Sequence, residues 1–143
     1  MNTRMRGPGA SRGHPVLPVA RELTEQTFRK RDIPGVRRIA ALFGTRAGMR
    51  PGQLQDWVQA VSEAAACAVA QGPCTARVRL WTMGRRVFCE MSGDGTLRAD
   101  GPPGGPQRYE ERLRRWLLPR LCDHASVMSG PQGVTVVLSM KVA

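Results

Sequence analysis

The chain has 143 residues, 41% of them hydrophobic, and carries 22 Lys and Arg against 11 Asp and Glu, a formal charge of +11. This length suits a single domain with a core of its own, and no apolar run is long enough to predict a membrane-spanning helix. The N-terminal stretch has no apolar signal core, so we expect a cytoplasmic protein that contacts no membrane.

The first 23 residues predict a flexible basic tail, because glycines and prolines alternate there with scattered arginines. We expect a folded domain over 24–143, opening with an edge strand over 24–31. Asp32 has the side chain of an N-cap, and Pro34 suits the first turn of a helix because its missing N–H is not needed there. This first helix is expected to end among the glycines at 44–48.

A second helix is predicted from Pro51 or Gly52 to Gln71, because the segment is rich in alanine and free of internal glycine or proline. Its apolar stripe predicts a buried face; the stripe consists of Leu54, Trp57, Val58, Val61, Ala65, Ala68 and Val69. Glu63, Cys67 and Gln71 stand at i, i+4 and i+8 and are expected on one opposite face. Glu63 is therefore expected at the border between core and cleft.

In the second half of the chain, the apolar residues recur with the period of two that is typical of strands. Strands are predicted over 75–83 and 86–92, around a Gly84-Arg85 hairpin, and over 125–129 and 133–142. A loop rich in glycine and proline over 93–107 and a helix over 109–122, kinked at Pro119, separate the two hairpins. This order predicts an α+β fold, a two-layer sandwich with helices on one face of a largely antiparallel sheet.

The four cysteines form no Cys-x-x-Cys pair, which favours reduced thiols over a disulfide framework or a structural zinc site. Cys122-x-His124 supplies two ligands, too few for a metal cage, so no metal site is predicted. Almost all basic residues are Arg, and they do not alternate with aromatic residues as in single-strand binders. The charge therefore favours an acidic protein partner over nucleic acid.

Four short segments carry chemistry-bearing residues within this order. They are Glu63 with Cys67, Gln71 and Gly72; Asp94-Gly95; Arg112 with Arg114; and Gly133-Val134-Thr135. Together with the order of elements, they resemble the histidine-kinase-like ATPase (GHKL) superfamily. Within it the chain looks like the anti-sigma-factor serine kinases, small ATP-binding regulators of actinobacterial type. The resemblance covers 24–143 and implies that ATPase fold, with ATP and Mg²⁺ as cofactors.

The family's catalytic helix has a Glu that polarises the attacking hydroxyl and, four residues later, an Asn that holds Mg²⁺. Glu63 matches the Glu, whereas Cys67 stands in place of the Asn and Gln71 in place of a common His. A thiol is a poor ligand for Mg²⁺, which prefers hard oxygen donors. Because phosphoryl transfer depends on metal and positioning, this change implies weakened chemistry.

The other three family motifs are matched to different extents. In the Asp-x-Gly-x-Gly motif that binds adenine, Gly95 matches the first glycine, Gly93 replaces the Asp, and Asp94 could serve only after a shift of one residue. Arg112 and Arg114 replace both glycines of the phosphate loop; they can contact phosphate but cannot reproduce a close backbone approach. The terminal Gly-x-Thr, from Gly133 to Thr135, is intact.

The resemblance leaves three functional hypotheses. In the first, the protein is a pseudoenzyme-like transcription regulator that binds a sigma factor or an anti-sigma-factor antagonist, with ATP binding weakened or lost. In the second, it is an active ATP-dependent protein serine/threonine kinase, with Glu63 as base, Asp94 on adenine and Arg114 on phosphate. In the third, it is a basic interaction module that contacts nucleic acid. A homodimer remains open in each case.

Overall fold

A single five-stranded sheet forms one layer of the molecule, with its strands in the order β1-β2-β3-β5-β4 and every neighbouring pair antiparallel. The strands are β1 (Arg21–Phe28), β2 (Ala76–Met83), β3 (Arg86–Gly93), β4 (His124–Gly130) and β5 (Gly133–Lys141). The structure is a computed structural model and describes residues 21–69, 75–93, 112, 116–130 and 133–142.

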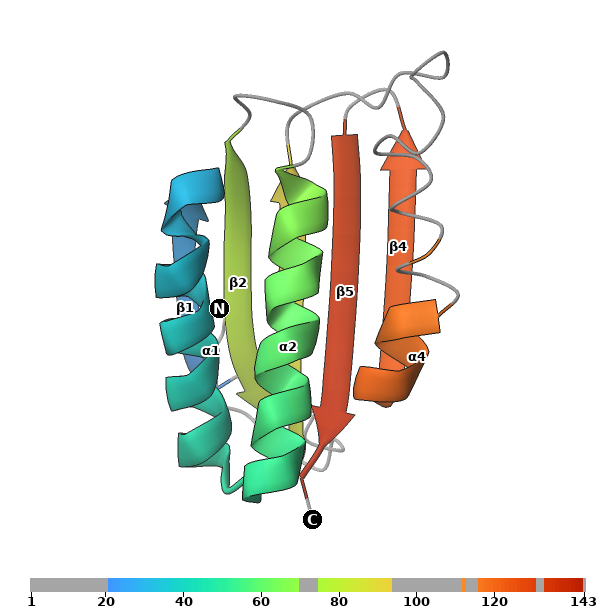
Figure 1. Ribbon diagram of the computed structural model, residues 1–143. Coiled ribbons are helices and arrows are strands. Elements are labelled where there is room, and N and C mark those ends of the chain that lie inside the picture. Colours follow the sequence, from blue (N-terminus) through green and yellow to red (C-terminus); the bar gives the residue numbers. More distant parts are fainter. Residues whose placement is uncertain (1–20, 70–74, 94–111, 113–115, 131–132, 143) are drawn as a thin grey trace, which may run out of the picture.

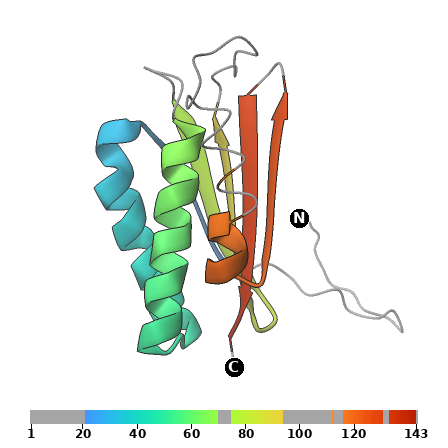
Figure 2. The same ribbon diagram turned by 45° about the vertical axis from the view of Figure 1, so that its right-hand side comes forward.

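The helices form a second layer on one face of the sheet (Figure 1 and Figure 2). They are α1 (Ile33–Ala47), α2 (Pro51–Ala68) and α4 (Leu118–Leu121), with a short 3-10 turn, η1 (Lys30–Asp32), before α1. α2 packs on β3 and β5 and lies between α1 and α4. These two layers confirm the predicted α+β sandwich. In the part of the chain that the structure describes, no helix is long and apolar enough to span a membrane.

The core lies between the two layers and follows the alternation predicted from the sequence. Ala76, Val78 and Leu80 of β2 are buried, and so are the residues that face the same side on β3, namely Val87, Cys89 and Met91. Glycines permit the turns around this core: Gly48, at φ 93°, ends α1, and Gly84, at φ 62°, lies in the β2–β3 hairpin.

Helices α1 and α2 pack closely against each other at a glycine and a tryptophan. The Trp57 indole is fully buried, and its Nε1 donates a hydrogen bond of 3.2 Å to the Ala40 carbonyl oxygen in α1. At Gly44 the helices approach so closely that a Cβ would lie 2.6 Å from Leu54 Cδ1. The contact between α1 and α2 therefore requires a large side chain at Trp57 and no side chain at Gly44.

Both predicted ends of the first strand need correction. Strand β1 spans Arg21–Phe28 rather than 24–31, so the folded part begins within the stretch assigned to the tail. The strand ends early because Asp32, at the N-cap of α1, forms a tight turn: its carboxylate accepts a 2.9 Å hydrogen bond from the Arg29 N–H. The predicted irregularity at Pro119 is present: Trp116 and Leu117 have π-helical geometry, and α4 follows them from Leu118 to Leu121. Residues 109–111 and 113–115 of the predicted helix lie outside the described residues.

Candidate functional site

Glu63 lies where the sequence predicted, at the edge of the buried face of α2. It is half-buried and borders a groove that opens between α1 and α2, on the side away from the sheet. A carboxylate in this position is accessible to a molecule that lies on the helix layer.

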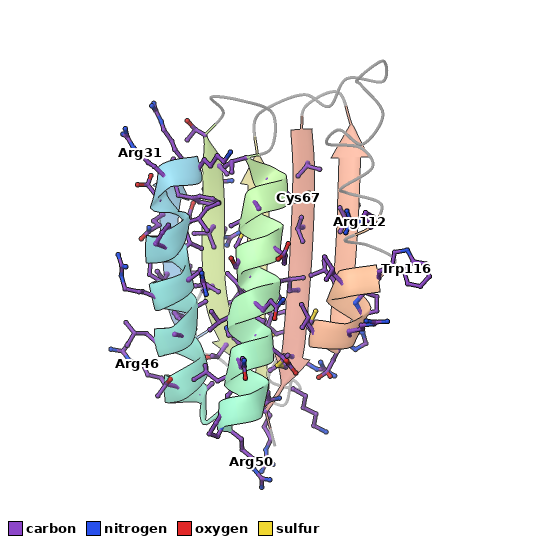
Figure 3. All side chains as sticks on the ribbon, viewed as in Figure 1. Arg31, Arg46, Arg50, Cys67, Arg112 and Trp116 are labelled. Carbon is purple, nitrogen blue, oxygen red and sulfur yellow. The ribbon has the colours of Figure 1, made fainter. Side chains whose placement is uncertain are left out.

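Cys67 lies in a different environment from Glu63, although the two are one turn apart. Its side chain is only 4% exposed and belongs to the core between α2 and the sheet (Figure 3). The prediction that both residues share a cleft face is wrong, because the buried arc of α2 is wider than the predicted stripe and also includes Ala60 and Ala64. Gln71, the third residue of that face, lies outside the described residues.

Thr135 and Glu63 lie on opposite sides of the sheet. In β5 the side chains of Val134, Val136 and Leu138 are buried towards the helices, so Thr135 points to the other face. The β3 register agrees, since Thr135 pairs with Ser92 while Val134 pairs with Gly93. Gly133 begins β5 with φ 126°, a backbone conformation that favours glycine.

Gly93, at the position of the family's adenine-binding Asp, packs directly on the end of α2. A Cβ at this position would overlap the carbonyl oxygen of Ala68 and lie 3.0 Å from its carbonyl carbon. The strand and the helix thus meet backbone to backbone, where the family's carboxylate would need room. Asp94 and Gly95 lie outside the described residues.

Arg112 is exposed, and in Figure 3 it lies over β4, whereas Cys67 lies on the β5 side of α2. Arg114 lies outside the described residues. Of the nine candidate residues predicted from the sequence, the structure therefore describes Glu63, Cys67, Arg112, Gly133 and Thr135, and it does not bring these five to one site.

The described residues do not fit a magnesium-nucleotide site. The residue in the metal-holding position, Cys67, is a buried thiol, and the threonine of the intact Gly-x-Thr faces the far side of the sheet. Gly93 packs so closely on the end of α2 that a side chain at this position has no room. Among the residues that the structure covers, no three His, Cys, Asp or Glu side chains are grouped to hold a metal ion. Cys122 is buried and His124 is exposed.

The three described cysteines are free, buried thiols. Burial, with the Cys122 and Glu90 charges as smaller contributions, raises the pKa of Cys89 far above its ordinary value. Burial also raises the pKa of Cys122 to about 11, with a further contribution from the adjacent Asp123 carboxylate. Cys122 Sγ donates a hydrogen bond of 3.3 Å to the Leu118 carbonyl oxygen, which favours the protonated form. These thiols are therefore placed for packing rather than for nucleophilic chemistry.

We expect these thiols to resist alkylation in the folded protein. In a Cys74→Ser variant, which removes the remaining cysteine, iodoacetamide at pH 8 should modify the three described thiols at least about a hundredfold more slowly than in 6 M guanidinium, because all three are buried and burial raises the pKa of Cys89 and Cys122. Mass spectrometry over time gives the rates. Modification of Cys67 at the speed of an exposed thiol would contradict its place in the core.

A groove of about 570 Å³ runs along the outer side of the helix pair; we call it the α1–α2 groove. Its apolar part consists of Ala41, Leu54 and Val58, all half-buried, and polar side chains flank it, among them Arg37, Gln55 and Gln59. Sequence reasoning assigned Leu54 and Val58 to the core and missed the groove.

The sheet face away from the helices carries a cluster that joins β1, β2 and β3. Arg79 lies between Glu25, at 3.8 Å, and Glu90, at 3.1 Å, and its guanidinium carbon stands 5.6 Å from the centre of the Trp81 ring. Phe88 stacks on the same ring, with the ring centres 5.2 Å apart. Trp81 thus makes both an aromatic and a cation–π contact within the protein, and Arg79 pairs with two carboxylates. The face offers little of the free aromatic surface on which single-stranded nucleic acids stack.

The comparisons with known proteins do not supply a family for this chain. No family model matches it, and no curated protein matches its sequence significantly.

Proposed function

We propose that this protein is a cytoplasmic regulatory protein that resembles the anti-sigma-factor serine kinases and acts by binding another protein, without efficient ATP chemistry. The partner proposed from that resemblance is a sigma factor or an anti-sigma-factor antagonist. The element order and the helix-on-sheet layers support the resemblance, because they match what it implies for 24–143.

One observation carries the loss of ATP chemistry: Cys67, in place of the metal-holding Asn, is buried in the core. A buried thiol offers Mg²⁺ neither a hard oxygen ligand nor an accessible one. Without the metal, the developing charge of a transferred phosphoryl group would lack its main compensation.

The charge distribution supports protein binding. Between residues 29 and 50 the sequence has seven Lys or Arg and a single acidic residue, Asp32. In Figure 3, Arg31, Arg46 and Arg50 extend outward from α1 and its two ends. A basic helix of this kind attracts an acidic partner and speeds encounter with it.

The second candidate is an active serine kinase of the same family, which Glu63 favours because the catalytic carboxylate remains. Under this alternative, Glu63→Ala should abolish phosphorylation of the partner while leaving its binding intact. Under the proposed function, no phosphorylation depends on Glu63. Phosphate labelling of the partner should then be the same with wild type and with Glu63→Ala.

The test is capture from the native host, followed by reconstitution. Tagged full-length protein is used to isolate partners, and each is then purified and tested for direct binding with and without Mg-ATP. We expect a sigma factor or an antagonist that binds with equal affinity in both conditions. Recovery of nucleic acid alone, or a partner that binds only with Mg-ATP, would contradict the proposal.

A further inference from the structure

The two edges of the sheet differ in how they are protected against a further strand. β1, at one edge, includes three charged residues among its eight, and a register shift between Arg21 and Thr24 interrupts its pairing with β2. Both features hinder the addition of another strand. β4, at the other edge, contains no Lys, Arg, Asp or Glu and pairs with β5 without interruption from His124 to Gly130. Neither feature therefore protects the β4 edge.

Exposed apolar side chains lie beside the β4 edge on both faces of the sheet. Met128, 60% exposed, pairs with Thr135 and so lies on the face away from the helices. Trp116, 63% exposed, precedes α4 in the helix layer, and in Figure 3 it extends outward beside the middle of β4. Of the four large hydrophobic side chains that are exposed among the described residues, two thus lie at this edge.

We propose that the β4 edge joins two copies of this chain into a dimer with one continuous sheet. The two β4 strands run antiparallel, and the two-fold axis passes through Val127, the middle residue of the strand, at right angles to the sheet. The contact, which we call the β4 seam, is seven residues and therefore about 23 Å long. This inference goes beyond the proposed function, since it requires no other protein.

The two-fold axis brings the exposed apolar groups of both copies together. On the face away from the helices, Met128 of one copy lies opposite Ser126 of the other, and the two methionines lie diagonally across the seam, within reach of each other. Because the axis is perpendicular to the sheet, both helix layers lie on the same side. The two Trp116 side chains then approach each other beside the middle of the seam.

This geometry selects a second copy over two other occupants. An isolated extended peptide would add a single strand, about 4.8 Å wide, and no second layer, so Trp116 in the helix layer would stay exposed. A second copy supplies a strand and a helix layer at matching positions. A nucleic acid would find no Lys or Arg on β4 to pair with its phosphates.

Sedimentation equilibrium of the full-length protein, in reducing buffer to exclude disulfides between chains, tests for the dimer. We expect a monomer–dimer equilibrium with a Kd of about 10–100 µM, as suits a small interface. Each chain carries a formal charge of +11, whereas β4 has no Lys, Arg, Asp or Glu to form an ion pair at the seam. Raising the salt from about 0.1 M to about 0.5 M should therefore tighten the dimer about threefold or more. A protein that is monomeric at about 300 µM, or a dimer that salt weakens, would overturn the proposal.

Lysine substitutions at the two edges locate the seam. Met128→Lys places a lysine from each copy close to the two-fold axis and should weaken the dimer at least about tenfold. The matched control is Leu23→Lys, at a 51% exposed position in β1, which should change the Kd less than about twofold. If circular dichroism shows that Met128→Lys folds poorly, Ser126→Lys, at an exposed position on the same face of β4, replaces it. Equal effects at β1 and β4 would show a general charge effect and contradict the seam.

Hydrogen exchange identifies the backbone groups that the dimer covers. Between about 5 µM and about 300 µM protein, exchange of the outward amides of β4 should slow about threefold, because these N–H groups gain partners, whereas exchange in β1 should not change. Slower exchange in β1, with β4 unchanged, would refute the β4 seam.

The same variants keep this proposal separate from the proposed function. If the full-length protein stays monomeric and Met128→Lys instead removes binding of a captured partner, the edge belongs to that partner. The dimer is then wrong while the proposed function stands. If the dimer forms but no protein partner is captured, the seam stands and the proposed function fails.

Discussion

Replacing Gly93 by alanine is expected to destabilise the protein by at least about 3 kcal/mol, the upper range for overpacking a close-packed site. The added Cβ would overlap the carbonyl oxygen of Ala68 and lie 3.4 Å from its Cα. The obstacle is backbone, so no side-chain rotation can relieve the overlap. Either the end of β3 or the end of α2 must move.

Denaturation in guanidinium, followed by circular dichroism, measures this loss. The matched control is Gly52→Ala in the first turn of α2, where a Cβ would meet nothing within 4 Å; its effect should stay within about 1 kcal/mol and could be stabilising. A Gly93→Ala protein as stable as wild type would show that the backbone contact between β3 and α2 is not a feature of the molecule.

Replacing Trp57 by alanine is expected to cost about 3–5 kcal/mol, the range measured when a large aromatic side chain is removed from a core. The indole is fully buried beneath α1, and its Nε1 holds the Ala40 carbonyl oxygen. The neighbouring Gly44 cannot fill the space that would be left. For a chain of 143 residues, this loss should lower the melting temperature by about 10–20 °C.

The matched control for Trp57 is the same substitution at Trp116, which is 63% exposed. Trp116→Ala should change stability by no more than about 0.5 kcal/mol, as is usual for surface positions. Similar melting temperatures for the two variants would mean that Trp57 does not hold the helix layer together.

The three central strands, β2, β3 and β5, could be predicted because they face the core with alternate residues. Val78 and Leu80, like Cys89 and Met91, repeat with the period of two that a half-buried sheet imposes, and glycines mark the turns between strands. The end of β1 was harder to predict, since the turn that follows this strand depends on a hydrogen bond from the Arg29 backbone N–H to the Asp32 carboxylate. Such a local bond leaves no periodic signal.

The candidate site was less predictable because site membership depends on which way a side chain faces. Glu63 and Cys67 are one turn apart, yet the boundary of the core runs between them. For Thr135, the motif spacing was right, but strand parity places its side chain on the far face of the sheet. The α1–α2 groove was invisible in the sequence because it forms only when two separate helices lie side by side.

The central claim is that the chain binds a protein without using ATP, and equilibrium dialysis of full-length protein against radiolabelled ATP with Mg²⁺ tests it most directly. We predict no saturable binding up to about 1 mM ATP, for wild type and Glu63→Ala alike. Binding of one ATP per chain with a Kd at or below about 100 µM, weakened by Glu63→Ala, would contradict the claim and favour an active kinase.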